Sequence, residues 1–209
     1  VQTFALVADK VVAQDTLPDG STAVLNKRSS ITYEYSSRQK VRKVKLKGES
    51  YFDVKHLEEK PFIIEAEEVL IRDIGTTFNV KAWPESDTVE VFVKTGLVQI
   101  YTLEDAGIGL QAGETGIYSK SSKVFSPLEK SDANVLAYQT GELSFVNKDL
   151  KSVIEKINEV FDSQIRQENP ALETCRMTVS FHHDTLDTVV DVIAETMKLS
   201  VVRNGKEIV

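Results

Sequence analysis

Alternation of apolar and polar residues dominates the chain from Leu17 to about Phe125 and predicts β-strands. In segment 89–93 the valines occupy every second position and so share one face of a strand, and Val98 and Ile100 repeat the pattern. Glycine and proline interrupt it at spacings typical of an all-β domain, and no amphipathic helical stripe occurs. The pattern predicts an all-β sandwich or a short solenoid-like roll, and periodicity does not choose between them.

A glycine break and a polar segment subdivide and end this β-rich region. Segment 46–54 predicts a pair of strands separated by a break at Gly48. The polar segment 126–134, which contains Pro127, predicts a linker. We therefore place an all-β domain at residues 1–130 and a small α/β module at residues 131–209, which makes the fold class mainly β plus α+β.

The module contains an internal repeat. Segments 143–166 and 179–202 each read as strand, polar turn, amphipathic helix and strand. Apolar residues of the first copy recur 36 positions later, pairing Phe145 with Phe181, Leu150 with Leu186, Val153 with Val189, Ile157 with Ile193, Phe161 with Met197, and Ile165 with Val201. Each helix therefore has one apolar face, and the module is predicted to be βαββαβ.

Polar residues mark the ends of these elements. Asn147 or Asp149 can cap the first helix, and Asp184 or Thr185 can cap the second, by accepting backbone N–H bonds. Asn204-Gly205 predicts a tight hairpin turn before the final residues 207–209.

Composition narrows the function classes. The net charge of −7 lacks the basic surplus that neutralises phosphates, so nucleic-acid binding is not expected. The single cysteine, Cys175, cannot form a disulfide within the chain, and zinc-site spacing is absent. No apolar run or signal peptide suggests membrane insertion. The chain begins without methionine, and we expect it to be an excised part of a longer protein.

His182-His183-Asp184 is the only segment that resembles a metal-ligand cluster. Adjacent residues on a strand point to opposite faces, so two neighbouring imidazoles do not easily bind one ion. No further ligand has a recognisable spacing. We expect a solvated or capping role, with no metal and no cofactor.

The densest basic segment comprises Arg38, Lys40, Arg42, Lys43, Lys45 and Lys47. With Val44 and Leu46 turned inward, the three lysines are predicted to form one exposed strand face. Such a face is usually solvated and discourages edge-to-edge pairing. The alternative is contact with an acidic partner or lipid headgroups.

No catalytic constellation is visible. Glu49 and Asp53 share a strand face, but no nearby histidine, arginine or metal motif gives them a task. Segment 110–114 lacks the P-loop pattern, and Cys175 lies on a predicted strand, where a thiol is usually inert. We expect no enzymatic activity and no catalytic residues.

The motifs in this order resemble a known family, the FecR-type domain. The matching segments are 17–21, 25–26, 29–30, 46–49, 51–54, 61–62, 75–80, 89–91, 96–98, 110 and 113–114. The most specific of them is Gly75-Thr76-Thr77-Phe78-Asn79-Val80. Segment 141–147 with Leu150 resembles the C-terminal domain of Bacteroidetes-type members, which is similar to the short N-terminal domain of secretins and TonB-dependent receptors. The chain departs from the family at Tyr138, where tryptophan is common, and at Asp149, where proline is common.

The resemblance implies the periplasmic sensor region of a transmembrane anti-sigma factor. In that family a cytosolic segment holds an extracytoplasmic-function sigma factor and one helix crosses the inner membrane, and we expect both to lie outside this chain. The implied partner is the N-terminal signalling domain of an outer-membrane TonB-dependent receptor. The implied signal is uptake of a ligand such as an iron chelate or a glycan.

A small α/β module with an open sheet edge can accept a partner strand. Two strands could provide that edge, and their candidate partner-binding residues are Leu143, Ser144 and Phe145, or Leu199, Ser200, Val201, Val202 and Arg203. A different hypothesis is a periplasmic glycan- or peptide-binding module. Its stacking platform would come from the aromatic residues Trp83, Tyr33, Tyr35 and Tyr51, although single aromatics on strands more often serve packing.

Overall fold

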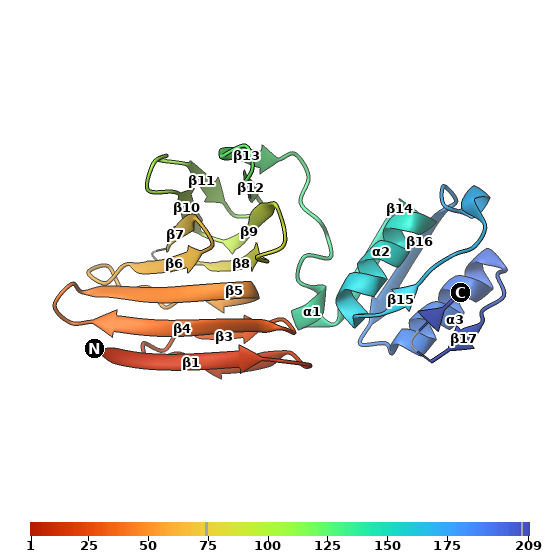
Figure 1. The fold of residues 1–209 in the computed structure, drawn as a ribbon, viewed down its shortest axis with the longest axis horizontal. Helices are drawn as coiled ribbons and strands as arrows, with labels where there is room; N and C mark the ends of the chain where they lie inside the picture. The colour runs from red at the N-terminus through yellow and green to blue at the C-terminus, as the bar shows by residue number, and fades with distance from the viewer. Residues whose placement is uncertain (74, 206) are drawn as a thin grey trace. The chain divides into compact units, whose positions relative to one another are not determined.

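The computed structural model describes residues 1–73, 75–205 and 207–209. The chain forms two compact units, Val1–Val135 and Leu136–Val209, which are described separately (Figure 1). The fold class is confirmed, because the chain is mainly β, with a near-barrel sheet followed by a small α/β part.

The first unit is built from strands that share one continuous sheet. In the described ranges it contains thirteen strands. They are β1 (Gln2–Ala8), β2 (Ala13–Thr16), β3 (Thr22–Leu25), β4 (Ser29–Ser36), β5 (Val41–Asp53), β6 (Phe62–Ala66), β7 (Val69–Asp73), β8 (Thr77–Ala82), β9 (Thr88–Thr95), β10 (Leu97–Tyr101), β11 (Ile108–Gln111), β12 (Thr115–Ser119) and β13 (Val124–Leu128).

Strand β5 belongs to two faces of this sheet. Its first half pairs with β4 and, in parallel, with β6, whereas its second half pairs with β3 and β8. One face has the order β1-β4-β5-β6-β7-β10-β11 and the other β2-β3-β5-β8-β9-β12-β13. The predicted pair of strands broken at Gly48 is therefore wrong. One strand of 13 residues passes through Gly48 at φ 93° and changes faces there.

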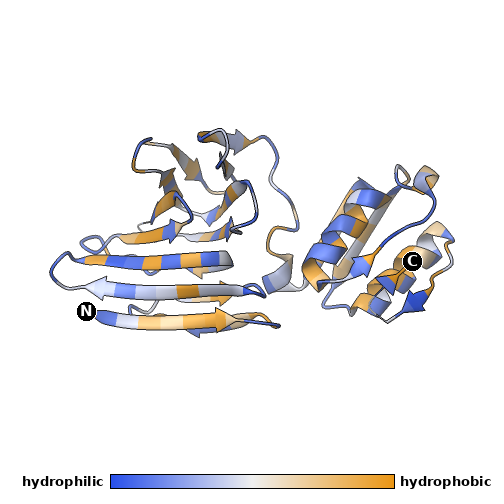
Figure 2. Ribbon diagram, viewed as in Figure 1, coloured by the Kyte–Doolittle hydropathy of each residue, from blue (hydrophilic) through white to orange (hydrophobic). Residues whose placement is uncertain are grey.

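Period-two alternation places the core of the first unit as the sequence predicts. Val89, Val91 and Val93 are at most 1% exposed, and Val98 and Ile100 are equally buried. Figure 2 shows the alternation as orange and blue bands along β5. Phe52 packs against Phe62 and Phe78, with ring centroids 6.2 and 5.7 Å apart. These side chains belong to one apolar cluster enclosed by both faces of the sheet.

The first part of the predicted linker is a strand. Residues 126–128 belong to β13, where Pro127 lies opposite Gly116 of β12. Proline is tolerated there because β13 is an edge strand and needs no N–H bond on its outer side. Beyond β13, the Ser131 hydroxyl donates to the Gly113 carbonyl at 3.1 Å. This segment is thus attached to the all-β unit.

In its described residues, the second unit contains two small sheets and two helices of 12 residues each. Its elements are α1 (Ala137–Thr140), β14 (Glu142–Asp149), α2 (Leu150–Phe161), β15 (Gln164–Ile165), the 3-10 helix η1 (Pro170–Leu172), β16 (Arg176–His182), α3 (Leu186–Met197), β17 (Arg203–Asn204) and β18 (Glu207–Ile208). Strands β14 and β16 form one sheet, and β15-β18-β17 form the other. Helix α2 contacts β14 of the first sheet and β15 of the second. The repeat is present, with α1, η1 and a terminal hairpin strand added to the predicted order.

Each long helix begins at one of the predicted caps. The Asp149 carboxylate accepts the Ser152 N–H at 2.9 Å, and this bond lowers the pKa of Asp149. The Thr185 hydroxyl accepts the Thr188 N–H at 3.3 Å. Asn147 instead lies in the irregular stretch of β14 between Phe145 and Lys148, at φ 50°.

The hairpin predicted at Asn204-Gly205 is confirmed by the pairing of β17 with β18. Gly205 has a positive φ of 64°, which glycine adopts without steric cost.

Candidate protein-interaction site

Several segments that resemble the FecR domain meet inside the first unit. Arg42 is completely buried, and its Nη1 lies 2.6 Å from Asp19 Oδ2. Its Nε donates to the Lys60 carbonyl at 2.7 Å, and its guanidinium lies 5.1 Å from the Phe62 ring centroid. Arg42 was grouped with the solvated basic segment by sequence, and burial shows that grouping to be wrong. The Arg42–Asp19 ion pair joins the turn at residues 17–21 to the sheet.

A second polar cluster surrounds Glu49, which is 4% exposed. Its Oε2 accepts the Asn26 side-chain N–H at 2.8 Å, and its Oε1 accepts that of Asn79 at 2.9 Å. Asp53, in contrast, is exposed at the end of β5. The two carboxylates therefore form no pair, and Glu49 connects β5 to β8 and to the loop after β3.

The remaining candidates of the first unit do not converge on a site. Lys45 and Lys47 are exposed and Lys43 is half-buried. Tyr33 and Tyr51 are only 1% and 7% exposed, so their predicted availability for stacking on sugars is wrong. The Tyr35 ring lies 5.3 Å from Lys60 Nζ, and the Trp83 ring lies 5.8 Å from the Arg28 guanidinium.

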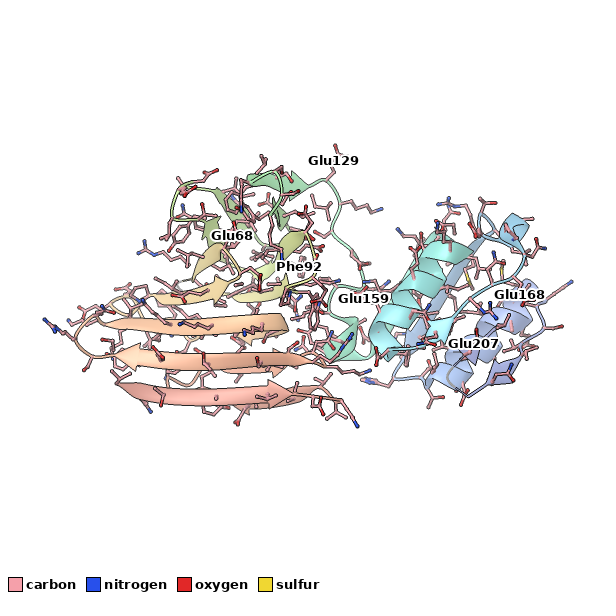
Figure 3. All side chains as sticks on the ribbon, in the orientation of Figure 1. Glu68, Phe92, Glu129, Glu159, Glu168 and Glu207 are labelled. Carbon is pink, nitrogen blue, oxygen red and sulfur yellow. The ribbon has the colours of Figure 1, made fainter. Side chains whose placement is uncertain are left out.

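A broad groove of the first unit was not anticipated. The centres of water molecules can occupy about 780 Å³ of it. Five carboxylates, two lysines and the rings of Tyr101 and Tyr118 contribute to its lining. Glu68, labelled in Figure 3, accepts the Tyr118 hydroxyl at 3.1 Å and pairs with Lys123. The hydrogen bond from Lys123 lowers the pKa of Glu68.

The two histidines of the second unit lie on its surface. His182 and His183 are exposed, and the Asp184 carboxylate accepts the His182 backbone N–H at 2.9 Å. Across the described ranges, no group of three or more histidine, cysteine, aspartate or glutamate side chains could hold a metal ion.

The two sets of candidate partner-binding residues lie on different sheets. Leu143 and Phe145 of β14 are each 3% exposed and belong to the core of the second unit, whereas Ser144 between them is exposed. Of these three candidates, only Ser144 presents its side chain to a partner.

The segment 199–203 is more accessible. Leu199 and Val201 are half-buried, and Ser200, Val202 and Arg203 are exposed. The predicted strand is wrong for residues 199–202, because β17 begins at Arg203. Val202 and Val209 nevertheless exchange both backbone hydrogen bonds, at 2.8 and 2.9 Å. This pair extends the hairpin by one position.

The alternation of antiparallel pairing defines the outer edge of this hairpin. Val202 and Val209 form a hydrogen-bonded pair, so the next pair, Arg203 with Ile208, is a non-hydrogen-bonded one. The N–H and C=O of Arg203, and likewise those of Val201, therefore point away from β18. Strand β17 pairs only with β18 among the described strands, which leaves this edge open. The Arg203 side chain is held by Asp187 and Asp191 of α3.

An apolar cleft lies beside this edge. Its lining comes from α2, α3, β15, β18 and residues 199–201. The centres of water molecules can occupy about 60 Å³ of it. Leu199, Ser200 and Val201 contribute to the lining, so the open edge and the cleft share residues. The sequence singled out this segment as a candidate strand, and no pattern along the chain indicated the cleft.

None of the helices in the described ranges is long and apolar enough to span a bilayer.

Comparison with known proteins identifies the family. The family model described as FecR protein matches residues 6–99, and the model described as FecR, C-terminal matches residues 142–209. No curated protein matches the chain.

Two crystal structures share the fold, both described as a proposed anti-sigma factor from Parabacteroides distasonis ATCC 8503. The first, at 1.65 Å resolution, has a TM-score of 0.75 and 24% sequence identity, over 98% of this chain and 97% of that chain. The second, at 2.50 Å resolution, has a TM-score of 0.74 and 24% identity, over 99% and 97% of the two chains. With both family models matched in order and the fold shared along the chain, this protein belongs to the FecR family.

Proposed function

We propose that this chain is the periplasmic sensor region of a transmembrane anti-sigma factor. It receives a signal from the N-terminal signalling domain of an outer-membrane TonB-dependent receptor and relays it to an extracytoplasmic-function sigma factor. A signalling role follows from the family, and the receptor and sigma-factor partners are the proposed part. The relay needs no catalytic chemistry and no cofactor.

The observation that carries the proposal is the open outer edge of β17. Arg203 and Val201 direct their backbone N–H and C=O groups to that side. A partner strand that pairs there gains main-chain hydrogen bonds, and neighbouring side chains provide specificity. A signal then requires that the partner binds two states of the sensor with different affinity.

The test is a calorimetric titration of this chain with the signalling domain of the receptor encoded beside it. We expect saturable one-to-one binding. Val201→Pro removes an N–H that the hairpin does not use, and it should weaken binding at least about tenfold, the equivalent of about 1.4 kcal/mol. Val201→Ala keeps that N–H and serves as the matched control for the loss of the side chain.

Both variants need an amide NMR spectrum like that of the unaltered chain, so that a change in binding is not a change in fold. Absence of binding by the unaltered chain at high micromolar concentration would contradict the receptor proposal. Equal binding by the proline variant would move the interface away from β17, and the edge of β14 would then be tested by proline at Ser144.

The groove of the first unit supports a second candidate function, a periplasmic glycan- or peptide-binding module. Its volume of about 780 Å³ lies in the range of small-molecule sites, and Tyr101 offers a partly accessible ring. Titration with a panel of oligosaccharides and peptides, followed by the amide resonances of β7 and β10, would test it. No shift with any of them would exclude it.

A further inference from the structure

Strand β1 is an edge of the first unit that carries none of the usual protection against pairing. Among the described strands, β1, β2, β11 and β13 are edges, because each pairs with one neighbour only (Figure 1). Natural sheets protect edges with short strands, charged residues, proline or bulges. Strand β2 has four residues and includes Asp15, β11 has four and includes Gly109, and β13 contains Pro127. Strand β1 instead has seven uncharged residues, no proline and an unbroken register with β4.

Pairing further along the sheet shows which way the main chain of β1 points. In a strand, the N–H and C=O of one residue face one neighbour, and those of the next residue face the other. The Arg42 N–H donates to the carbonyl of Pro61, just before β6, at 3.0 Å, so Arg42 faces β6 and Lys43 faces β4. Lys43 lies opposite Glu34. Glu34 therefore faces β5, and its neighbour Tyr33 faces β1.

The same alternation continues into β1. Tyr33 lies opposite Phe4, so the N–H and C=O of Phe4 bond to β4. The residues at odd positions then direct these groups to the open edge. They are Thr3, Ala5 and Val7, and their side chains are exposed, that of Val7 to 68%. The edge thus presents main-chain donors and acceptors that the described strands leave unused.

Apolar side chains lie between these positions. Phe4 and Leu6 are half-buried and pack against the core of the first unit. Figure 2 shows β1 orange or pale along most of its length. Val11, in the loop that follows β1, is 70% exposed. Exposed apolar surface at an open edge is typical of a strand that pairs with another chain.

The sequence of β1 is complementary to a second copy of itself. Antiparallel pairing centred on Ala5 places Ala5 opposite Ala5 of the second copy, and Thr3 opposite Val7. All these residues have outward main-chain groups, so each pair exchanges two N–H···O bonds. Phe4 then lies opposite Leu6 of the second copy, at a position where Cα atoms are only about 4.5 Å apart. Such aromatic–aliphatic pairs stabilise sheets, and no like charges meet because β1 has none.

We propose that β1 is a self-association surface, through which two copies of this chain form a two-fold symmetric antiparallel dimer centred on Ala5. The contact is isologous and closed, since the same strand serves both copies. A foreign strand would gain the same main-chain bonds, but the second copy also matches Phe4 with Leu6. Strand β1 belongs to the first unit and β17 to the second, so this inference does not rest on the proposed receptor partner.

Sedimentation velocity of the complete chain over a concentration series measures the association. We expect a monomer–dimer equilibrium in the micromolar range. Ala5→Lys places two ammonium groups directly opposite each other, and it should raise the dimer dissociation constant at least about tenfold. Gln111→Lys adds the same charge at an exposed position of β11, the other edge of that face, and should leave association unchanged. A monomer at every concentration up to high micromolar would overturn the proposal, as would equally tight association of Ala5→Lys.

Amide hydrogen exchange tests the edge without any substitution. In dilute solution the amides of Thr3, Ala5 and Val7 should exchange quickly, whereas those of Phe4 and Leu6 should be protected by their bonds to β4. With rising concentration the three outward amides should become protected, and the other two should not change. Association that leaves the outward amides fast would place the contact on another surface and overturn the proposal.

Oxidative crosslinking tests the register, in a chain whose single native cysteine is replaced by Cys175→Ser. Ala5→Cys brings two thiols to a hydrogen-bonded pair, where Cα atoms about 5.5 Å apart suit a disulfide. Copper phenanthroline should therefore convert this variant to covalent dimers. Val7→Cys is the matched control, because the proposed register separates its two copies by four residues, about 14 Å. Faster crosslinking of Val7→Cys than of Ala5→Cys would overturn the pairing centred on Ala5.

Discussion

Arg42 and Asp19 form an ion pair inside the β unit, with Nη1 and Oδ2 2.6 Å apart and side chains only 1% and 7% exposed. The guanidinium also donates to the Lys60 and Lys55 carbonyls, at 2.7 and 3.0 Å. Charges taken out of water at this depth need such partners, because desolvation opposes their attraction. The pair ties the turn before β3 to the first half of β5.

Removing one partner of the Arg42–Asp19 ion pair should therefore lower the free energy of unfolding. Asp19→Ala leaves the Arg42 charge buried and uncompensated, and we expect the free energy of unfolding of the β unit to fall by about 3–5 kcal/mol. Urea unfolding followed by the fluorescence of Trp83, the single tryptophan, reports on this unit. Asp15→Ala, at an exposed position on β2, should change stability by no more than about 0.5 kcal/mol. Similar losses in the two variants would contradict this role for Arg42.

The Glu49 cluster makes a second prediction. Glu49→Gln keeps the shape but places an NH₂ group against one of the two asparagine amides that now donate to the carboxylate. We expect a loss of about 1–3 kcal/mol in the same urea assay. Asp53→Asn, the equivalent change at the exposed end of β5, is the control and should be nearly neutral. If neither Glu49→Gln nor Asp53→Asn changes the free energy of unfolding, the hydrogen bonds of Glu49 do not stabilise the unit.

Gly48 supports a third prediction, about the point where β5 changes faces. An added Cβ would lie 2.4 Å from Ser29 Oγ and 2.9 Å from Trp83 Cζ3, at a φ of 93°. Gly113, at φ 88°, has nothing within 4 Å of an added Cβ. Gly113→Ala should cost about 1–2 kcal/mol for the left-handed backbone alone. Gly48→Ala should lower stability by at least about 1 kcal/mol more, because overpacking against Ser29 and Trp83 adds to the backbone strain. Equal losses of stability in the two variants would contradict the crowding at Gly48.

Local sequence rules predicted much of the fold. Strand alternation located buried residues such as Val91 and Val98, and the caps at Asp149 and Thr185 were among the predicted candidates. Such features depend on neighbours within a few positions, where pattern and hydrogen-bonding capacity decide the structure. The 36-residue repeat likewise anticipated the order of the module's elements.

The misses depend on contacts between distant segments. Arg42 was grouped with lysines by charge, although it shares the inward face with Val44 and Leu46. The position of Arg42 on the strand therefore indicated its burial. Its ion-pair partner Asp19, 23 residues away, could not be predicted from the local pattern. The exchange of faces at Gly48 depends on pairing with four other strands. The apolar cleft of the second unit depends on how the three-stranded sheet packs on α2 and α3, which no local pattern encodes.

The last prediction concerns Tyr33, which lies beside the ion pair. Burial, and after it the Asp19 carboxylate, raise the pKa of Tyr33 to about 12 against the opposing effect of Arg42. In the unfolded chain a tyrosine ionises near pH 10, so between about pH 10 and 12 the folded state binds more protons than the unfolded state. The free energy of unfolding therefore falls as pH rises through this window, and the stabilisation is complete below it.

Tyr33→Phe removes this contribution, and its stability should decline less steeply than that of the unaltered chain above pH 10. Urea unfolding at a series of alkaline pH values measures the slopes, and tyrosinate absorbance follows the ionisation directly. Tyr101→Phe, at a half-buried ring of the same unit, controls for the loss of a hydroxyl. Parallel pH profiles for Tyr33→Phe and the unaltered chain would show that the Tyr33 phenol does not resist ionisation, and that the interior around Arg42 and Asp19 admits charge more readily than its burial implies.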